Sequence, residues 1–342
     1  MRTIPTKLAF SAVLFSALAW YVSLSSTFKT EQKNEFLYPS LLDQFNDITF
    51  IEISGSGQNT KLARNDYGWT VANRDSYPAN TKTIVKSLLE ISELRTIEPK
   101  RKLPKGHKKL GLMGPDIEPF ISRQILIRGL SDQTIVNLII GKSAQGLEGN
   151  YVRKNAENQS WLARGMLSLS PDPMTWLDTE IMDVPSKRIK AIKINNPEHR
   201  EIYISRKTSD TDRFSLNNIP EGYEVKSRSS LASLASLTEQ LRFVDVRSRD
   251  RIKNSNISRT IRITTFDSLV IEMTQYDSEE GEWVEFQFLA TNSPAPDENS
   301  PSTKVNELTN RTRDWIYVLP AYKQRIYKKS LASLIQKKNL EE

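Results

Sequence analysis

The sequence has no cysteine and only two histidines, His107 and His199. Missing thiols exclude disulfides, thiolate catalysis, zinc fingers and iron–sulfur clusters. Two imidazoles cannot form a histidine cluster for a transition metal. No other group of residues points to a reaction, so we expect a protein that is not an enzyme and that binds no cofactor and no metal.

Long apolar runs are also scarce, and the only run long enough to be a candidate membrane span lies near the N-terminus. Leu8–Leu24 is uncharged and would form a helix about 26 Å long, just enough to cross a bilayer. Arg2 and Lys7 precede it, which places Met1 in the cytoplasm and the body outside. We therefore predict a single-pass anchor in the inner (cytoplasmic) membrane with a periplasmic body. The alternative is a signal peptide cleaved near Ala17-Leu18-Ala19.

Apart from this segment, the composition is that of an ordinary globular protein. The chain has 342 residues, 38% of them apolar and 26% charged, which suits about two domains of roughly 150 residues each. The net charge of +7 would suit a nucleic-acid ligand in the cytoplasm. The predicted topology removes that partner and leaves anionic lipids or other envelope components.

The body contains two similar runs of elements. Alternating apolar residues and turn residues predict antiparallel strands, and apolar residues at helical spacing predict a helix after the third strand of each run. In the first run the strands are expected at 48–53, 60–64, 68–71, 124–127, 134–140, 150–153 and 160–163, with a helix at 81–94. In the second they are expected at 189–194, 201–205, 213–216, 259–263, 268–274 and 282–290, with a helix through Leu231, Leu234, Leu237 and Leu241.

This pattern predicts an α+β fold in which an N-terminal transmembrane helix precedes two tandem repeats of antiparallel sheet plus packed helix. The expected divisions are an anchor at 1–30, a first repeat at 36–168, a connection at 169–188 and a second repeat at 189–342, which ends in a helix at 322–338. Chance similarity between two amphipathic units is the alternative.

Several short motifs follow one another in an order typical of a known family. They are Phe36-Leu37-Tyr38-Pro39, the Gly68-Trp69 strand, Leu110-Gly111-Leu112, Ile139-Ile140-Gly141 and Asn150-Tyr151-Val152-Arg153. The chain resembles the DUF4340 family of membrane-anchored proteins associated with gliding-motility-type ABC transport systems. That resemblance implies an accessory role beside a transporter permease and supplies no catalytic residues.

The densest positive charge lies between Lys100 and Lys109. Pro104 and Gly106 predict a loop here, and both His107 and His199 are expected in solvated loops. The candidate contacts are Lys100, Arg101, Lys102, Lys105, Lys108 and Lys109. They form either a solvated loop or a contact for anionic lipid or an acidic partner.

Three further features of the sequence suggest local roles. Ala12 and Ser16 could pack the anchor against a neighbouring transmembrane helix. Gly141-Lys142-Ser143 resembles the end of a phosphate-binding loop, but Val136 stands where that motif needs glycine, so a turn is favoured. The acidic residues at 277–285 lack the spacing of a calcium loop and favour a hairpin tip.

The sequence therefore favours a non-catalytic, membrane-anchored accessory or binding subunit of an ABC-type system, with a permease or other membrane protein as partner and no nucleic acid. The alternative is a stand-alone envelope hydrolase or carbohydrate-binding protein.

Overall fold

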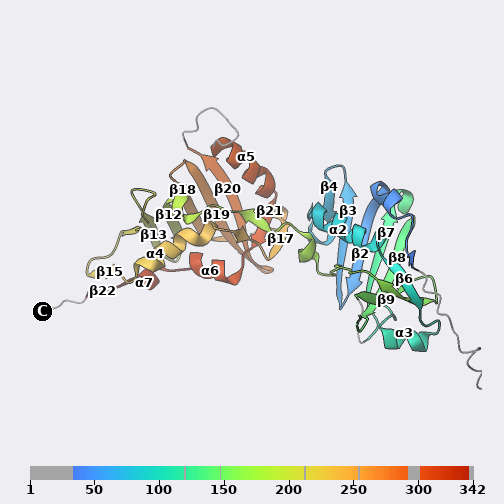
Figure 1. Ribbon diagram of the computed structural model, residues 1–342. Helices are drawn as coiled ribbons and strands as arrows, with labels where there is room; N and C mark the ends of the chain where they lie inside the picture. The colour runs from blue at the N-terminus through green and yellow to red at the C-terminus, as the bar shows by residue number, and fades with distance from the viewer. Residues whose placement is uncertain are drawn as a thin grey trace, which may run out of the picture. The chain divides into compact units, whose positions relative to one another are not determined.

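The computed structural model describes residues 34–118, 121–146, 148–211, 213–252, 255–291 and 301–338. They form two compact units (Figure 1). Unit 1 comprises the described residues up to Asn59 together with Lys82–Pro171. Unit 2 comprises Thr60–Thr81 and the described residues from Asp172 onward. The border at Pro171 falls inside the predicted connection at 169–188. Thr60–Thr81 belongs to unit 2, although it lies within the predicted first repeat at 36–168.

Unit 1 is an antiparallel sheet with the strand order β1-β6-β10-β9-β8-β7-β2. Its strands are β1 (Glu35–Phe36), β2 (Ile48–Gly55), β6 (Arg95–Pro99), β7 (Arg123–Gly129), β8 (Thr134–Ser143), β9 (Gly149–Lys154) and β10 (Ser160–Arg164). Its helices are α2 (Thr81–Ser92) and α3 (Pro104–Leu110), with 3₁₀ turns η1 (Leu42–Asp47) and η3 (Leu130–Asp132). Helix α2 buries Ile84, Leu88 and Ile91, the stripe predicted from their spacing.

Unit 2 contains an antiparallel sheet with the order β14-β13-β12-β18-β19-β20-β21-β17. Its strands are β12 (Ile189–Asn196), β13 (His199–Ser205), β14 (Ser215–Asn217), β17 (Asp245–Ser248), β18 (Asn256–Thr265), β19 (Leu269–Ser278), β20 (Gly281–Ala290) and β21 (Trp315–Val318). The strands β3 (Gln58–Asn65), β4 (Gly68–Val71) and β5 (Tyr77–Pro78) are sheet neighbours in that order. Two small sheets pair β11 (Glu180–Met182) with β16 (Leu241–Arg242), and β15 (Tyr223–Val225) with β22 (Ile335–Lys337).

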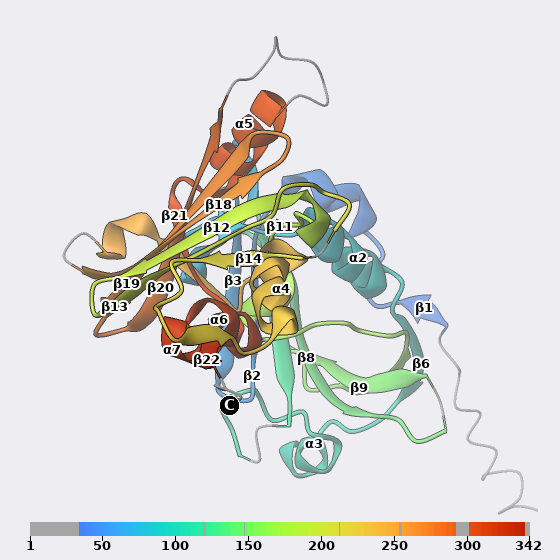
Figure 2. The same cartoon turned by 90° about the vertical axis from the view of Figure 1, so that its left-hand side faces the viewer.

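The helices of unit 2 are short. They are α4 (Arg228–Ala235), α5 (Pro301–Thr312), α6 (Ala321–Tyr327) and α7 (Leu331–Leu334), with 3₁₀ turns η2 (Ala72–Arg74), η4 (Pro173–Trp176), η5 (Ser186–Arg188), η6 (Ser236–Thr238) and η7 (Arg249–Ile252). Figures 1 and 2 place α4, α6 and α7 together beside the small β15–β22 sheet. In the turn η4, which lies within the predicted connection at 169–188, Trp176 is fully buried.

The two units share a strand order. In unit 1 the strands β2-β7-β8-β9-β10-β6 are neighbours in that order, and in unit 2 the corresponding strands are β12-β18-β19-β20-β21-β17. Each run has its helix, α2 or α4, between the first strands and the strand that closes the order. This common path is what a duplicated sheet-and-helix unit requires.

The predicted fold class needs correction. The described chain is mostly antiparallel β-sheet, and none of its helices is long and apolar enough to cross a membrane. The predicted anchor at 1–30 lies outside the described residues, so the transmembrane part of the predicted class has no support in the structure.

The predicted C-terminal helix at 322–338 is wrong. The chain forms α6, leaves helical geometry at Lys328 and Ser330, and continues as α7 and β22. Strand β22 pairs with β15, with Ile335 opposite Val225. The apolar residues that suggested one helical stripe are therefore shared among three elements.

Candidate functional site

The basic segment folds into a helix rather than the predicted loop. Pro104 occupies the first helical position of α3, where its fixed φ and missing N–H are tolerated. Gly111 ends the helix in the left-handed conformation (φ 71°), and its N–H donates to Lys108 O at 3.2 Å. The N–H of Leu112 donates to His107 O at 2.9 Å. This is a Schellman-type end, which is why a seven-residue helix can form here.

The buried side chain of His107 connects helix α3 to the segment before strand β10. The prediction that His107 lies in a solvated loop is therefore wrong. Its side chain is 4% exposed. Nε2 lies 2.9 Å from the carbonyl oxygen of Asn158 and 3.3 Å from that of Arg101. Ser160 Oγ donates to the same Arg101 carbonyl at 2.8 Å. These bonds hold the start and the middle of the basic segment against the beginning of strand β10.

The structure separates the six predicted cationic contacts into two groups. Lys100 is half-buried, and its Nζ pairs with Glu98 Oε1 at 2.8 Å. The other five are exposed and form no ion pair with any residue of the described chain: Arg101, Lys102, Lys105, Lys108 and Lys109. We call these five residues the basic cluster.

The sequence did not reveal the apolar side chains beside the basic cluster. Leu103 precedes α3 and is 72% exposed. Ile121 is also exposed, and a Cβ placed on Gly111 would lie 3.2 Å from Ile121 Cγ2 and 3.3 Å from Lys142 Cγ. Exposed Lys142 therefore adds a sixth cation next to the helix end. The sequence shows that Leu103 lies within the basic run. It does not show that Ile121 and Lys142 lie close to Gly111 at the end of α3, because this depends on the fold.

Three of the motifs on which the family resemblance rests meet at the end of α3. A Cβ on Gly141 would lie 2.3 Å from Leu110 O, so only glycine fits where strand β8 passes the end of α3. Arg153 Nη2 donates to Leu112 O at 3.3 Å, and its Nη1 donates to Glu157 O at 3.0 Å. Burial lowers the pKa of Arg153. The motifs at 110–112, 141 and 153 thus position the basic cluster.

Comparison with known protein families agrees with this convergence of motifs. The family model described as "Domain of unknown function (DUF4340)" matches residues 69–259, more than half of the chain. The chain belongs to the DUF4340 family. No curated protein matches it.

The matched range contains the basic cluster and the DUF4340 motifs at 110–112, 141 and 150–153. Within it, Gly141-Lys142-Ser143 belongs to strand β8, not to the predicted turn, and it lacks the helix that a phosphate-binding loop requires. Ala12 and Ser16, the candidate packing residues of the anchor, lie outside the described residues.

His199 differs from His107. It begins strand β13 and is exposed, so the predicted loop is wrong while the predicted solvent exposure is confirmed. With Tyr223 and Leu331 it lines a cavity of about 560 Å³ in unit 2. The two histidines belong to different units.

The acidic residues at the β19–β20 hairpin take separate partners. Glu285 is buried, pairs with Arg249 at 2.7 Å and accepts from the Tyr276 hydroxyl at 2.9 Å, which helps raise the pKa of Tyr276 to about 12 after the larger effect of burial. Glu282 pairs with Lys328. In the described part of the chain, no group of three or more His, Asp or Glu residues is arranged to hold a metal ion.

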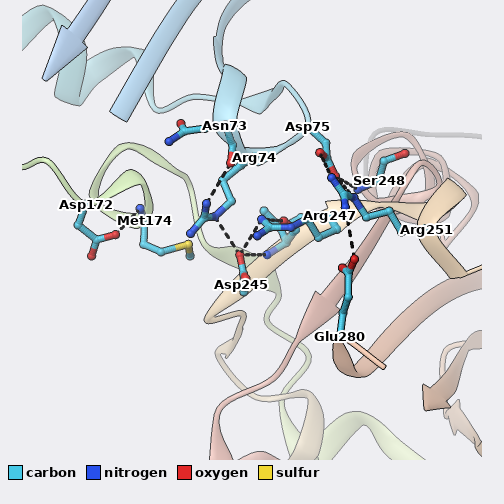
Figure 3. A network of polar contacts seen from close by, with 11 residues as sticks. Asn73, Arg74, Asp75, Asp172, Met174, Asp245, Arg247, Ser248, Arg251 and Glu280 are labelled. Carbon is cyan, nitrogen blue, oxygen red and sulfur yellow. Dashed lines mark hydrogen bonds and ion pairs between the residues drawn. The ribbon is translucent and has the colours of Figure 1, made fainter. Parts of the chain in front are cut away.

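A second polar network lies in unit 2 (Figure 3). Asp75 faces Arg251 and Ser248, and Arg74 Nε lies 3.0 Å from Asp245 Oδ1. Arg251 and the Ser248 N–H hold the pKa of Asp75 below its ordinary value against the opposing effect of burial. No pattern in the sequence predicted this network, because its two segments are far apart in the chain.

Proposed function

We propose that this DUF4340 protein is a non-catalytic, membrane-anchored accessory subunit of an ABC-type transport system, with its body outside the cytoplasm. In this proposal the basic cluster holds unit 1 against the anionic lipid headgroups around the transporter. The observation that carries it is the set of five exposed cations on and before α3, beside the exposed side chain of Leu103.

The chemistry of the surface supports lipid as the acidic partner. Each Lys or Arg near an anionic bilayer contributes on the order of 1 kcal/mol to binding. Exposed Leu103 and Ile121 add apolar area that can enter the headgroup region. An acidic protein surface without apolar area would pair with the lysines but would leave the 72% exposed Leu103 in water.

The rigid attachment of α3 also supports a contact role. The His107 and Ser160 bonds fix the backbone from which the cations project, so binding does not need to order a loop first. The accessory role itself rests on the family resemblance and on the predicted anchor, whose Leu8–Leu24 run offers no ionisable group for transport.

Hydrogen exchange on the full-length protein in nanodiscs tests the lipid contact. We expect the backbone amides of residues 105–112 to exchange more slowly in phosphatidylglycerol-containing discs than in pure phosphatidylcholine discs, and high salt to abolish the difference. The double variant Lys105→Gln, Lys109→Gln should lose this protection. A matched pair four residues apart on helix α2, Lys82→Gln with Lys86→Gln, should retain it.

Equal exchange in both lipids would contradict the membrane contact. Protection that appears only when a transporter permease is present would instead assign the basic cluster to an acidic protein surface.

Co-purification tests the accessory role. The full-length protein should co-purify with a multi-spanning permease in mild detergent, and Ala12→Leu with Ser16→Leu should weaken this association without preventing membrane insertion. Recovery as a lone monomer after crosslinking in native membranes would contradict the role.

A further inference from the structure

The cavity of about 560 Å³ in unit 2 lies beside the small β15–β22 sheet, and the proposed function does not use it. His199 and Arg200 at the start of β13 form one of its walls. The other walls come from the turn before β15, from α7 and from the start of β22, with the lining residues Pro220, Tyr223, Ser330, Leu331, Ala332 and Ile335. Its volume lies in the range of about 300–1,000 Å³ that is typical of small-molecule sites.

Backbone hydrogen bonds fix the walls of this cavity. The Tyr223 N–H donates to Pro220 O at 3.1 Å, and Gly222 between them has a left-handed φ of 79°. The Lys338 N–H donates to Gly222 O at 2.9 Å, which joins this turn to the residue that follows β22. The cavity is therefore shaped in advance, so that a ligand does not have to order its walls.

Most of the cavity lining is apolar. Leu331 is buried, and Pro220 and Ile335 are half-buried. Val225 lies opposite Ile335 in the small sheet, so Tyr223, two residues before Val225, shares the face of Ile335. The Tyr223 ring therefore extends the same apolar wall. This lining favours an apolar group on the ligand, since burying apolar surface is worth about 25 cal/mol per Å².

The charge at the cavity has one sign. Arg200 is exposed, and its side chain forms no hydrogen bond or ion pair with any described residue. Its neighbour Glu201 pairs with Lys193 at 2.7 Å. Glu224 accepts from Gln336 at 2.9 Å on the opposite face of the small sheet. None of the described residues that line the cavity is acidic.

This charge distinguishes the cavity from its neighbours. Three other cavities of unit 2, with volumes of about 510, 660 and 470 Å³, each have two or more acidic residues in their lining. Those linings disfavour an anion, whereas the cavity at Arg200 combines an apolar interior with an accessible cation. The complementary ligand has an apolar body and one negative charge.

We propose that this cavity binds a fatty acid, with the acyl chain against Leu331 and Ile335 and the carboxylate on Arg200. An arginine guanidinium donates two parallel hydrogen bonds to a carboxylate, which fixes the orientation of the ligand. His199 on the same wall offers a ring nitrogen as a further hydrogen-bonding group. One guanidinium balances the single charge of a carboxylate. The site does not depend on the membrane contact proposed for unit 1.

Photo-crosslinking of the full-length protein in phosphatidylcholine nanodiscs tests this proposal. The probe is decanoic acid with a diazirine near the end of its chain, and its methyl ester is the uncharged control. We expect the acid to label residues 220–223 or 330–335 at a lower concentration than the ester does. Arg200→Gln should raise the concentration for half-maximal labelling by about tenfold through loss of charge-assisted hydrogen bonds. Arg213→Gln, at another exposed arginine of unit 2, should leave it unchanged.

A variant that fills the cavity gives a second test. Ala332 is exposed and lines the cavity, so Ala332→Trp should block labelling while the urea midpoint of unfolding stays that of the wild type. Equal labelling by acid and ester would overturn the proposal, as would labelling that Ala332→Trp leaves unchanged. Displacement of the probe by an acetylated peptide ending in leucine, but not by unlabelled decanoic acid, would also overturn it. The Lys105→Gln, Lys109→Gln protein should be labelled normally, which separates this test from that of the membrane contact.

Discussion

The Asp75 carboxylate accepts two hydrogen bonds from the Arg251 guanidinium, 3.0 Å from Nε to Oδ2 and 3.0 Å from Nη2 to Oδ1 (Figure 3). The two residues are 176 positions apart in the chain, and the Ser248 N–H donates to the same carboxylate at 3.0 Å. This fork joins the Thr60–Thr81 segment to the rest of unit 2. Bidentate geometry makes it stronger than an ordinary surface ion pair, although solvent still screens it.

Asp75→Asn should therefore lower the free energy of unfolding by about 1 kcal/mol at neutral pH, after allowance for solvent screening. The folded state lowers the pKa of Asp75, so this stabilisation is present above the carboxyl's ordinary pKa and is lost as pH falls through the folded value. The difference between wild type and variant should shrink in acid. Urea unfolding at neutral pH and at about pH 3 checks this.

Asp314→Asn is the control for that measurement. Asp314 pairs with its exposed neighbour Arg313, and its loss should change stability little. Equal effects of the two substitutions, or an Asp75→Asn difference that persists in acid, would show that the fork does not stabilise unit 2.

Gly141 gives a steric prediction. A Cβ here would lie 2.3 Å from Leu110 O and 2.9 Å from Gly111 O, both backbone atoms. Gly141→Ala should destabilise unit 1 by about 3 kcal/mol, since either strand β8 or the end of α3 must move. Gly146→Ala, in open space but at φ +77°, should cost only about 1 kcal/mol. Thermal unfolding of both variants measures the ranking, and the reverse order would refute the close approach.

The two histidines give a matched pair. His107→Ala removes the side chain that contacts Asn158 O and leaves a space under α3, so it should cost about 1–3 kcal/mol and speed hydrogen exchange across Pro104–Leu110. His199→Ala, at an exposed position, should change stability by less than about 0.5 kcal/mol. Unchanged exchange in α3 of the His107→Ala protein would mean that other contacts hold the helix.

Lys323 carries a pH-dependent prediction. Its side chain is 4% exposed, and its Nζ donates to Ser236 O and Glu239 O, each at 2.6 Å. Lys323→Met leaves both carbonyls without this donor and should cost about 1–3 kcal/mol. Lys207→Met, at an exposed position, is the control and should have almost no effect.

Burial lowers the pKa of Lys323, so on alkaline titration the folded state releases this proton before the unfolded state does. Stability contributed by Lys323 therefore rises with pH through that interval. The difference in unfolding free energy between wild type and Lys323→Met should grow as pH rises toward the ordinary pKa of lysine. A difference that shrinks over this range would contradict the buried placement of the ammonium group.

Local pattern in the sequence determined much of the fold. Alternation located the paired strands β7 and β8 and the paired strands β9 and β10 within a few residues, because one face of each must be apolar. Helical spacing located α2 through Ile84, Leu88 and Ile91. The ordered motifs also identified the family without any knowledge of contacts. Some of these motif residues are restricted by packing, since at Gly141 a side chain would clash with the backbone of Leu110.

Tertiary structure decided the surfaces and sites. Pro104 and Gly106 suggested a loop, yet the segment is helical because Gly111 ends it and Asn158 and Ser160 hold it, both far along the chain. The sequence placed Lys323 in one predicted helix at 322–338, and only its position against Ser236 shows it to be buried.

The same reason covers the cavity lined by Arg200 and Ile335, which the sequence did not indicate. The two residues are far apart in the chain, and they line one cavity only because α7 and β22 lie beside the start of β13. Sequence periodicity reports which face of an element is apolar, whereas a site depends on which elements become neighbours. Which elements become neighbours depends on the packing energy of the whole sheet, and a local sequence pattern does not contain that information.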